Sequence, residues 1–313
     1  MRFPRPLLLA LLALVLASCA GPQVVRTPPP AARPIATTTE YYRPPAERPA
    51  PVAPKPAPVT FFSGWKPSGP APSIRASSYI VIDASTGRLL GSRNANTRRH
   101  VASTQKLLTA LVVLAEEPLN GRVTVAASDT WVEPSKLSLK TGQTYTRRNL
   151  LLAMMVKSAN DVANVVARDC AGSTEAFASK MNAYARRLGC RDSHFKNAHG
   201  LTVSGQYSTA ADVSRIARAA WRSSFLRDAM KRKTYSFRYS TGTTITLTNT
   251  NKCLTRLSAC NGMKTGYTSA SGRCLVSSAT WQGRSVIVVQ LGTTSSSVWT
   301  DGIKLMKWGL GMP

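Results

Sequence analysis

Residues 73–313 predict an α+β fold, in which an antiparallel sheet is flanked by helices and joined to a helical subdomain. Strand-like apolar runs lie near both ends of this segment, and stretches with helical periodicity fill the region between them. A length of about 240 residues is ample to bury one large core or two closely joined domains.

The strand-like runs fall in two places. Residues 79–83 and 88–92 are short apolar runs separated by Ala-Ser-Thr-Gly, which predicts a hairpin. Residues 263–291 predict two further strands joined at Gln282-Gly283. Strands from the two ends of the segment are therefore expected to share one sheet.

The helices are predicted from the spacing of apolar residues. Residues 149–169 have few polar interruptions, which predicts a largely buried helix that is broken near residues 157–160. The other predicted helices are 103–116, 174–188, 209–221 and 303–310.

The first eighteen residues predict a signal peptide. Two arginines precede an apolar run over residues 7–17, which is too short to span a bilayer as a helix. The run ends in Leu16-Ala17-Ser18-Cys19, which resembles the bacterial lipobox, so we expect cleavage before Cys19 and lipid on that residue. Ordinary cleavage nearby, with Cys19 incidental, is the alternative. The lipid reading predicts an exported, periplasmic protein anchored to a bacterial membrane, and Ala20 favours the outer one.

Residues 19–72 are predicted to be a lipidated cysteine followed by a proline-rich tether. Residues 22–72 hold fifteen of the twenty prolines and few large aliphatic residues, so this stretch cannot build a core. If it is largely extended, at about 3.1 Å per residue, it reaches on the order of 150 Å. A solvated linker without a specific reach fits the composition equally well.

The charge of the chain is strongly positive. It has 41 Lys and Arg against 14 Asp and Glu, and residues 73–313 hold 33 and 12 of these. Such a field attracts nucleic acid, anionic headgroups or the carboxylate-rich peptides of a bacterial wall. The export signal and the lack of interleaved stacking aromatics argue against nucleic acid. Simple solubility remains the alternative explanation.

Five of the six cysteines lie beyond the predicted lipidation site. In an oxidising compartment the spacing allows Cys253 to pair with Cys260 and Cys170 with Cys190, although the sequence leaves the pairing open. Cys274 lies in a strand-like run and is expected to be a buried thiol. Neither CxxC nor HExxH occurs, so we expect no metal and no cofactor.

Three short motifs occur in order along the chain, namely Ser103-Thr-Gln-Lys106, Ser158-Ala-Asn160 and Lys264-Thr-Gly266. Each alone is a weak signal. The same patterns also occur at Ser63-Gly-Trp-Lys66, Ser92-Arg-Asn94 and Lys140-Thr-Gly142. These three matches are discarded because they lie in the tether, at the end of a predicted strand and in a polar turn.

The first retained motif is typical of a nucleophile with its base. A serine at the start of a helix lies near unpaired backbone N–H groups, and a lysine three residues on rises from the same face. Lys106 can therefore deprotonate Ser103, provided that burial and nearby positive charge lower the pKa of the lysine. A serine N-cap with a solvated lysine is the alternative, but Leu107, Leu108 and Leu111 predict that this helix lies in the core.

The other two motifs supply polar groups at the points where they are needed. Ser158 and Asn160 interrupt an apolar helix, and such buried groups need partners, such as a leaving amine and a substrate backbone, or else local hydrogen bonds at a helix break. In Lys264-Thr265-Gly266, the glycine permits close backbone approach, and the lysine and threonine can bind a carboxylate. A plain strand-edge lysine is the alternative.

The order and surroundings of these motifs resemble the superfamily of penicillin-binding proteins and serine β-lactamases. The family that the chain resembles most is that of the low-molecular-mass D-alanyl-D-alanine carboxypeptidases. The resemblance runs from about residue 79 to 308, and it rests on the following segments: Ala102-Ser-Thr-Gln-Lys-Leu-Leu-Thr109, Lys157-Ser-Ala-Asn-Asp161, Phe195-Lys-Asn-Ala-His-Gly-Leu201, Asn249-Thr-Asn251 and Gly262-Met-Lys-Thr-Gly-Tyr267.

The resemblance implies a β-lactamase/transpeptidase-like fold and an acyl-enzyme mechanism. Ser103 would be acylated by the penultimate D-alanine of a peptidoglycan stem peptide, or by a β-lactam, with Lys106 as the base. Ser158 would assist proton transfer, with Lys264 as a further candidate for this role, and Asn160 would orient the substrate. The backbone N–H groups of Ser103 and Tyr267 would form the oxyanion hole. The substrate-binding set is then Asn160, Lys264, Thr265, Gly266 and Tyr267.

The chain also departs from the family. Many of these carboxypeptidases carry an arginine before the final helix that holds the substrate carboxylate, and here Val298 stands in that position. His199 matches the family and is interpreted as a structural turn residue. A class A β-lactamase is a rival, but the Glu117-Pro-Leu-Asn120 stretch lies on the wrong side of Ser158, and no acid occurs near residues 195–201.

Two other functions stay open on the sequence alone. One is a D,D-endopeptidase that cleaves peptidoglycan cross-links, because the motifs do not separate it from a carboxypeptidase. The other is a non-catalytic, wall-binding lipoprotein, which explains the tether and the charge but leaves the three ordered motifs to coincidence.

Overall fold

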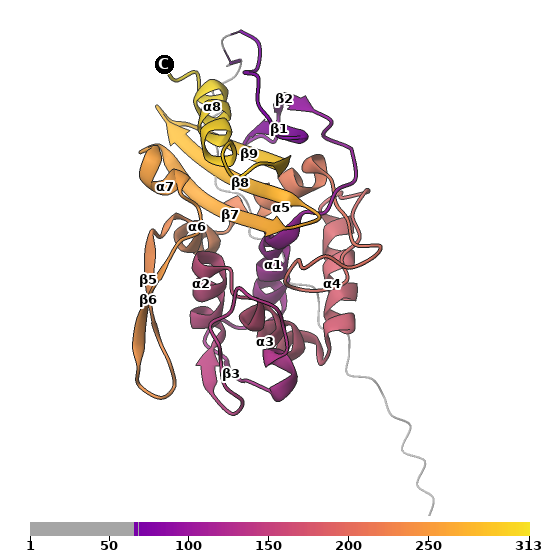
Figure 1. The fold of residues 1–313 in the computed structure, drawn as a ribbon, viewed down its shortest axis with the longest axis vertical. Coiled ribbons are helices and arrows are strands. Elements are labelled where there is room, and N and C mark those ends of the chain that lie inside the picture. Colours follow the sequence, from indigo (N-terminus) through magenta and orange to yellow (C-terminus); the bar gives the residue numbers. More distant parts are fainter. Residues whose placement is uncertain (1–65, 68) are drawn as a thin grey trace, which may run out of the picture. The chain divides into compact units, whose positions relative to one another are not determined.

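A five-stranded antiparallel sheet is the scaffold of the part of the chain that this computed structural model describes, residues 66–67 and 69–313. Strand β1 pairs with β9, so the first and last strands of the chain are neighbours in the middle of the sheet (Figure 1). In sheet order the strands are β2 (Leu89–Arg93), β1 (Ser78–Asp83), β9 (Arg284–Thr293), β8 (Gly272–Trp281) and β7 (Cys260–Thr268).

The structure confirms the predicted hairpin and corrects the predicted pair of strands at the C-terminal end. Residues 260–293 form three strands, because β7 turns into β8 over residues 269–271 before the predicted turn at Gln282-Gly283. Gly272 has φ +63°, a left-handed conformation that glycine adopts without steric cost, and it pairs with Thr268 at the end of the hairpin. This extra strand makes β7 the free edge of the sheet.

Helices cover both faces of the sheet (Figure 1). Helix α8 packs on β8 and β9 from one side, while α5 and α6 pack on β1, β9 and β7 from the other, where the helical part of the molecule continues. The helices are α1 (Lys106–Glu116), α2 (Arg147–Lys157), α3 (Asn160–Ala171), α4 (Thr174–Arg187), α5 (Ala210–Arg222), α6 (Ser224–Lys231), α7 (Cys253–Arg256) and α8 (Val298–Leu310).

The predicted helix break is confirmed. Helix α2 ends at Lys157 because Ser158 adopts a left-handed conformation, with φ +67°, and α3 begins two residues later at Asn160. The helix predicted from residue 103 opens as a short 3₁₀ turn, η1 (Ala102–Gln105), and only then becomes α1. The closing helix begins at Val298 rather than at residue 303, one turn earlier than predicted.

Two small hairpins and a second 3₁₀ turn were not predicted. In the second hairpin, Phe237 and Leu247 are buried and the residues beside them are not, which is the alternation expected of a strand with one covered face. Phe237 packs against Tyr145 and Tyr239, with ring centroids 5.3 and 5.2 Å apart. The elements are β3 (Arg122–Thr124), η2 (Ala127–Thr130), β4 (Thr144–Thr146), β5 (Thr234–Arg238) and β6 (Thr244–Thr248).

The structure contains neither of the disulfides that the spacing allowed. Cys170, Cys190, Cys253 and Cys260 are buried free thiols. The Cys190 thiol faces the carbonyl of Asp212, and that of Cys253 faces the carbonyl of Trp299. Cys274 lies buried in β8, as predicted.

The predicted signal peptide, Cys19 and most of the tether lie outside the described residues. The last tether residues contact the domain, because the Trp308 indole donates to the carbonyl of Gly69 at 3.2 Å and Ala71 packs against the core under α8. Among the helices of the described segment, none has the length and apolar character that crossing a bilayer requires.

Asp161 fixes a loop that borders the region between the sheet and the helices. Its carboxylate is buried and accepts the backbone N–H groups of Leu137 and Leu139 at 3.1 and 3.2 Å. Residues 133–139 are thereby attached to the first turn of α3. The negative charge also lies near the N-terminus of that helix, where the backbone dipoles favour it.

Replacing Asp161 by alanine is expected to lower the free energy of unfolding by about 2–4 kcal/mol, because buried N–H groups lose a charged acceptor. Urea unfolding measures the change. Asp161→Asn keeps one acceptor oxygen and should lose less. Asp192→Ala, which removes a half-exposed ion pair with Arg98, should change the value by less than about 1 kcal/mol. Equal values for the alanine variants would contradict this role of Asp161.

Candidate active site

Ser103 lies where the chain enters α1. The residue before it, Ala102, has φ +47°, a strained left-handed conformation for a residue with a Cβ, and η1 then carries the chain into the helix. One turn later Lys106 projects on the same side, and its Nζ lies 2.8 Å from Ser103 Oγ. The serine and lysine predicted as nucleophile and base are therefore in hydrogen-bond contact.

The Lys106 amine is fully buried and surrounded by oxygen acceptors. Besides Ser103 Oγ, its Nζ lies 2.6 Å from Asn160 Oδ1 and 2.6 Å from the carbonyl of His199. Burial lowers the pKa of Lys106 well below its ordinary value, and the charge of Lys264 lowers this pKa further, while Asp161 raises it. The neutral form of the amine is therefore favoured, and in that form it can accept a proton from the serine.

A second serine–lysine pair lies beside the first. Lys264 projects from β7, is fully buried, and has its Nζ 2.7 Å from Ser158 Oγ and 3.0 Å from the carbonyl of Thr265. Burial lowers the pKa of Lys264 to about 7. The Ser158 hydroxyl is thus linked to a group that can both donate and accept a proton near neutral pH.

Asn160 connects the first pair to the neighbouring loop. Its Oδ1 accepts from Lys106, and its Nδ2 donates to the carbonyls of Glu133 and Pro134 at 2.8 and 3.1 Å. The sequence suggested a role in orienting the substrate, whereas the structure shows the amide holding the lysine. The substrate role stays a prediction, because Asn160 also lines the cavity described next.

The two serines open into one cavity of about 240 Å³. Lys106 and Lys264 lie behind its wall. The cavity is lined by residues of the three motifs and by their neighbours in the fold: Ser103, Pro134, Ser135, Lys157, Ser158, Asn160, Gly200, Leu201, Thr250, Thr265, Gly266, Tyr267, Thr268, Arg273, Cys274, Val298 and Trp299. The discarded motif matches at Ser92 and Lys140 do not line it.

Two glycines let separate segments of backbone meet at Ser103. A Cβ on Gly266 would lie 2.9 Å from the Ser103 nitrogen, so β7 passes directly beside the serine. A Cβ on Gly200 would lie 2.2 Å from the carbonyl oxygen of Ala102, and Gly200 has φ +92°. Only glycine allows this approach at either position. The backbone of β7 at Gly266 and the backbone at Gly200 therefore both lie directly beside the start of η1.

His199 contributes its backbone rather than its ring. Its carbonyl accepts from Lys106 and, at 3.2 Å, from Ser103 Oγ, while its Nδ1 accepts the N–H of Leu201 at 3.1 Å. Burial and the charge of Lys106 lower the pKa of the imidazole to about 3, so the ring stays neutral. This agrees with the interpretation of His199 as a turn residue.

Acids and metal sites are missing from the cavity region of the described chain. None of the lining residues is an aspartate or glutamate, and Glu117 pairs with Arg147 at 3.1 Å instead. Between residues 69 and 313, no cluster of three or more His, Cys, Asp or Glu residues is arranged to hold a metal ion.

Sequence reasoning missed Thr250 and Arg273 as site residues. Thr250 was seen only as the middle of an Asn-Thr-Asn segment, yet its hydroxyl lies 2.6 Å from that of Thr265. Arg273 reaches the cavity because β8 pairs with β7, a register that no local pattern reveals.

The fold and the two serine–lysine pairs define a serine peptidase of the β-lactamase/transpeptidase-like class. The sequence matches the family described as D-alanyl-D-alanine carboxypeptidase over residues 66–295, and the chain belongs to this family.

Individual relatives agree with this assignment. The chain is 34% identical to a D-alanyl-D-alanine carboxypeptidase of Streptomyces sp. strain K15, covering 77% of this chain and 89% of the relative. It is 32% identical to one of Mycobacterium tuberculosis, covering 79% and 87%. The crystal structure of the Streptomyces K15 DD-transpeptidase superposes with a TM-score of 0.73 at 34% identity, covering 77% of this chain and 99% of that one.

The lowered pKa of Lys106 predicts the pH dependence of serine acylation. The rate of acylation by a penicillin should fall as the pH decreases, because protonated Lys106 cannot take the Ser103 proton. In Asp161→Asn, the charge that raises this pKa is gone, so the acidic limb should move to lower pH. Rapid-quench mass spectrometry between about pH 5 and 9 measures both profiles. A limb that moves to higher pH in the variant would contradict this assignment.

Proposed function

We propose that this protein is a serine-type D-alanyl-D-alanine carboxypeptidase that acts on peptidoglycan stem peptides through an acyl-enzyme on Ser103. The observation that carries the proposal is the contact of 2.8 Å between the buried Lys106 Nζ and Ser103 Oγ at the wall of the cavity. A neutral amine at this distance can act as general base for the hydroxyl.

Acylation follows from this geometry. Ser103 Oγ attacks the carbonyl carbon of the penultimate D-alanine, its proton passes to Lys106 Nζ, and the developing oxyanion receives the N–H groups of Ser103 and Tyr267. Ser158 then passes a proton to the nitrogen of the terminal D-alanine, and Lys264, 2.7 Å away, replaces that proton. The C–N bond breaks and D-alanine leaves.

Deacylation requires a water molecule to attack the Ser103 ester. The lining residues include no carboxylate, and Lys106 leaves acylation protonated. Once Lys106 has released the Ser103 proton to solvent, its amine can act as the base for this water, and the proton taken from water then returns to Ser103 Oγ. A β-lactam leaves its amine tethered to the acyl group after ring opening, and the attacking water is then hindered. The ester formed with penicillin is therefore expected to persist.

Intact mass after incubation with a penicillin tests the nucleophile. We expect one adduct per molecule of the parent protein, stable over the time needed for analysis, and no adduct on Ser103→Ala. Ser92→Ala, at the discarded motif match in β2, should keep the adduct. Absence of an adduct on a folded parent would instead favour the non-catalytic, wall-binding lipoprotein. Release of D-alanine from a pentapeptide, compared with cleavage of a cross-linked dimer, then separates carboxypeptidase from endopeptidase.

We also propose that the protein is exported and attached to a bacterial membrane, the outer one, through lipid on Cys19. The Leu-Ala-Ser-Cys segment and the proline-rich stretch after it support this.

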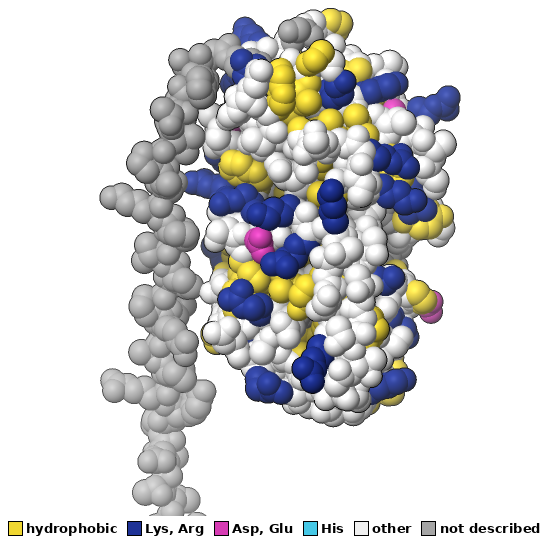
Figure 2. Space-filling model, turned by 90° about the vertical axis from the view of Figure 1, so that its left-hand side faces the viewer, with side chains coloured by type: hydrophobic (Ala, Val, Ile, Leu, Met, Phe, Trp, Pro, Cys, Tyr) yellow, Lys and Arg dark blue, Asp and Glu magenta, His cyan; other side chains and the backbone are white. Residues whose placement is uncertain are grey.

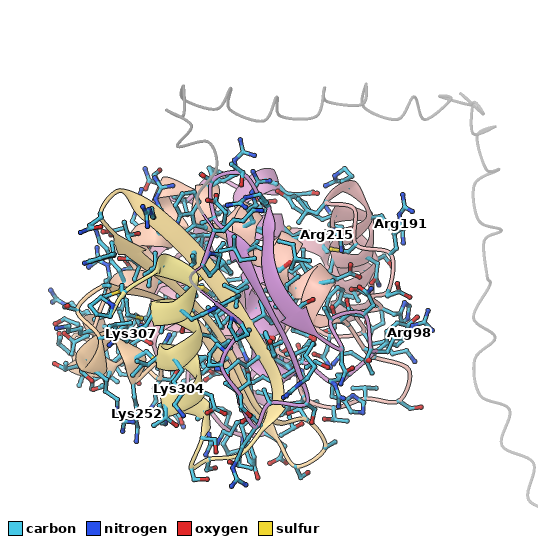
Figure 3. The ribbon with its side chains drawn as sticks, turned by 90° about the horizontal axis from the view of Figure 1, so that it is seen from above. Arg98, Arg191, Arg215, Lys252, Lys304 and Lys307 are labelled. Carbon is cyan, nitrogen blue, oxygen red and sulfur yellow. The ribbon has the colours of Figure 1, made fainter. Side chains whose placement is uncertain are left out.

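The positive surface fits an environment of carboxylate-rich wall peptides. Figure 2 shows Lys and Arg side chains scattered over one face with few acids. Figure 3 places Lys252, Lys304 and Lys307 on one side of the molecule and Arg98, Arg191 and Arg215 on another.

Replacing Cys19 by serine tests the anchor. Expressed in a bacterium with its leader, the parent should partition into the detergent phase and carry the mass of a diacylglycerol plus an N-acyl chain. Cys19→Ser should lose that mass and become extractable without detergent. Cys274→Ser, at a buried thiol of the domain, should keep the lipid. Equal partitioning of parent and Cys19→Ser would contradict the anchor.

A further inference from the structure

Among the residues that the structure describes, only two charged side chains line the cavity, and both are cations. They are Lys157, at the end of α2, and Arg273, on β8. A carboxypeptidase must bind the free carboxylate of its substrate, and Lys106 and Lys264 lie behind the cavity wall with their amines directed at Ser103 and Ser158. We infer that Arg273 binds the terminal carboxylate of the substrate and thereby selects peptides with a free C-terminus. This inference rests on the proposed function.

The register of the sheet places Arg273 on the same side of the cavity as Thr265. Arg273 is paired with Tyr267 across β7 and β8, and Thr265 is two residues from Tyr267 on the same face of the sheet. Diagonal neighbours of this kind have Cβ atoms about 7–8 Å apart, a span that a long side chain can cover. The guanidinium can therefore meet a group bound at the Thr265 hydroxyl.

The terminal residue of the substrate, which leaves in the reaction, must extend toward Thr265. Its amine has to reach Ser158, whose partner Lys264 directly precedes Thr265 in β7. The carboxylate of a terminal amino acid is only one carbon away from that amine, so it falls beside Thr265. Lys157 belongs to the end of α2, where its carbonyl accepts from Ser135 Oγ at 3.4 Å.

The guanidinium is held in place without using all its donors. Its Cζ lies 4.5 Å from the centre of the Tyr267 ring, and its Nε donates to Ser295 Oγ at 3.0 Å. The two terminal NH₂ groups make none of the hydrogen bonds or ion pairs found within the described residues. A guanidinium oriented in this way offers the paired donors that match the two oxygens of a carboxylate.

A pair of hydroxyls completes the carboxylate site. Thr250 Oγ1 and Thr265 Oγ1 are 2.6 Å apart, so one donates to the other and the second hydrogen is free to be donated elsewhere. Both threonines line the cavity. Helix α8 contributes Val298 and Trp299 to the cavity lining, whereas its lysines, Lys304 and Lys307, are not among the lining residues.

The test compares two substrates on the full-length protein, an acyl-D-Ala-D-Ala peptide with a free carboxylate and the same peptide as its C-terminal amide. For Arg273→Ala, kcat/KM on the free acid should fall about 10- to 100-fold, the range expected when a hydrogen bond to a charged group is lost, with most of the change in KM. On the amide it should change by less than about 3-fold. Adding Val298→Arg to this variant should restore part of the preference for the acid.

Control variants separate this role from a structural one. Lys252→Ala removes a cation that does not line the cavity and should keep the preference of the parent for the acid. An equal loss on both peptides in Arg273→Ala, or a loss of preference in Lys157→Ala instead, would overturn the assignment. If the parent forms the penicillin adduct but Arg273→Ala keeps the parent's preference for the free acid, the inference about Arg273 is wrong and the proposed function stands. A parent without adduct and without product contradicts the proposed function as well.

Discussion

The burial of two lysine amines is the constraint on which the rest of the site depends. An ammonium group removed from water without a bound anion costs several kcal/mol, and at Lys106 the Asp161 carboxylate offsets this only in part, because the pKa of the lysine remains well below its ordinary value. Each amine therefore tends toward its neutral form. A neutral amine 2.8 Å from the Ser103 hydroxyl is a base, and an amine with a pKa of about 7 that lies 2.7 Å from the Ser158 hydroxyl can exchange a proton with it. The same burial that destabilises the fold therefore makes both serines reactive.

Keeping both amines dry requires three distant segments to meet with little space between them. The chain achieves this with unusual backbone conformations at the contact points, φ +47° at Ala102 and φ +67° at Ser158, and with Gly200 and Gly266, where a side chain would collide with the backbone around Ser103. Such conformations persist only where the surrounding packing holds them. The five-stranded sheet provides β7 as a rigid edge, and the buried end of α2 provides Ser158. The core fixes both elements, and they hold the strained backbone between them in place.

The sequence predicted those parts of the site whose residues lie close together in the chain and form a recognisable local pattern. The spacing in Ser103-Thr-Gln-Lys106 forces both side chains onto one side of a turn, and the polar interruption at Ser158 correctly predicted the helix break. Asn160 was assigned to the substrate, because no local pattern shows that its Oδ1 points back at Lys106. Thr250 and Arg273 were missed for a similar reason, since the pairing of β7 with β8 and the loop before α7 bring them to the cavity. The hairpin of β5 and β6 had a readable signal, because apolar and polar residues alternate on both sides of Gly242.

The buried lysines also explain why this site needs an arginine. An amine whose pKa has been lowered so that it can exchange protons near neutral pH is a poor permanent anchor for a carboxylate, because it loses its charge over the same range. The guanidinium group keeps its charge at every pH at which a protein is folded. Proton transfer and carboxylate binding are therefore better served by different residue types, lysine behind the cavity wall and arginine within it. With Val298 apolar on α8, β8 is the element that supplies a guanidinium to the cavity that the Thr250–Thr265 pair also lines.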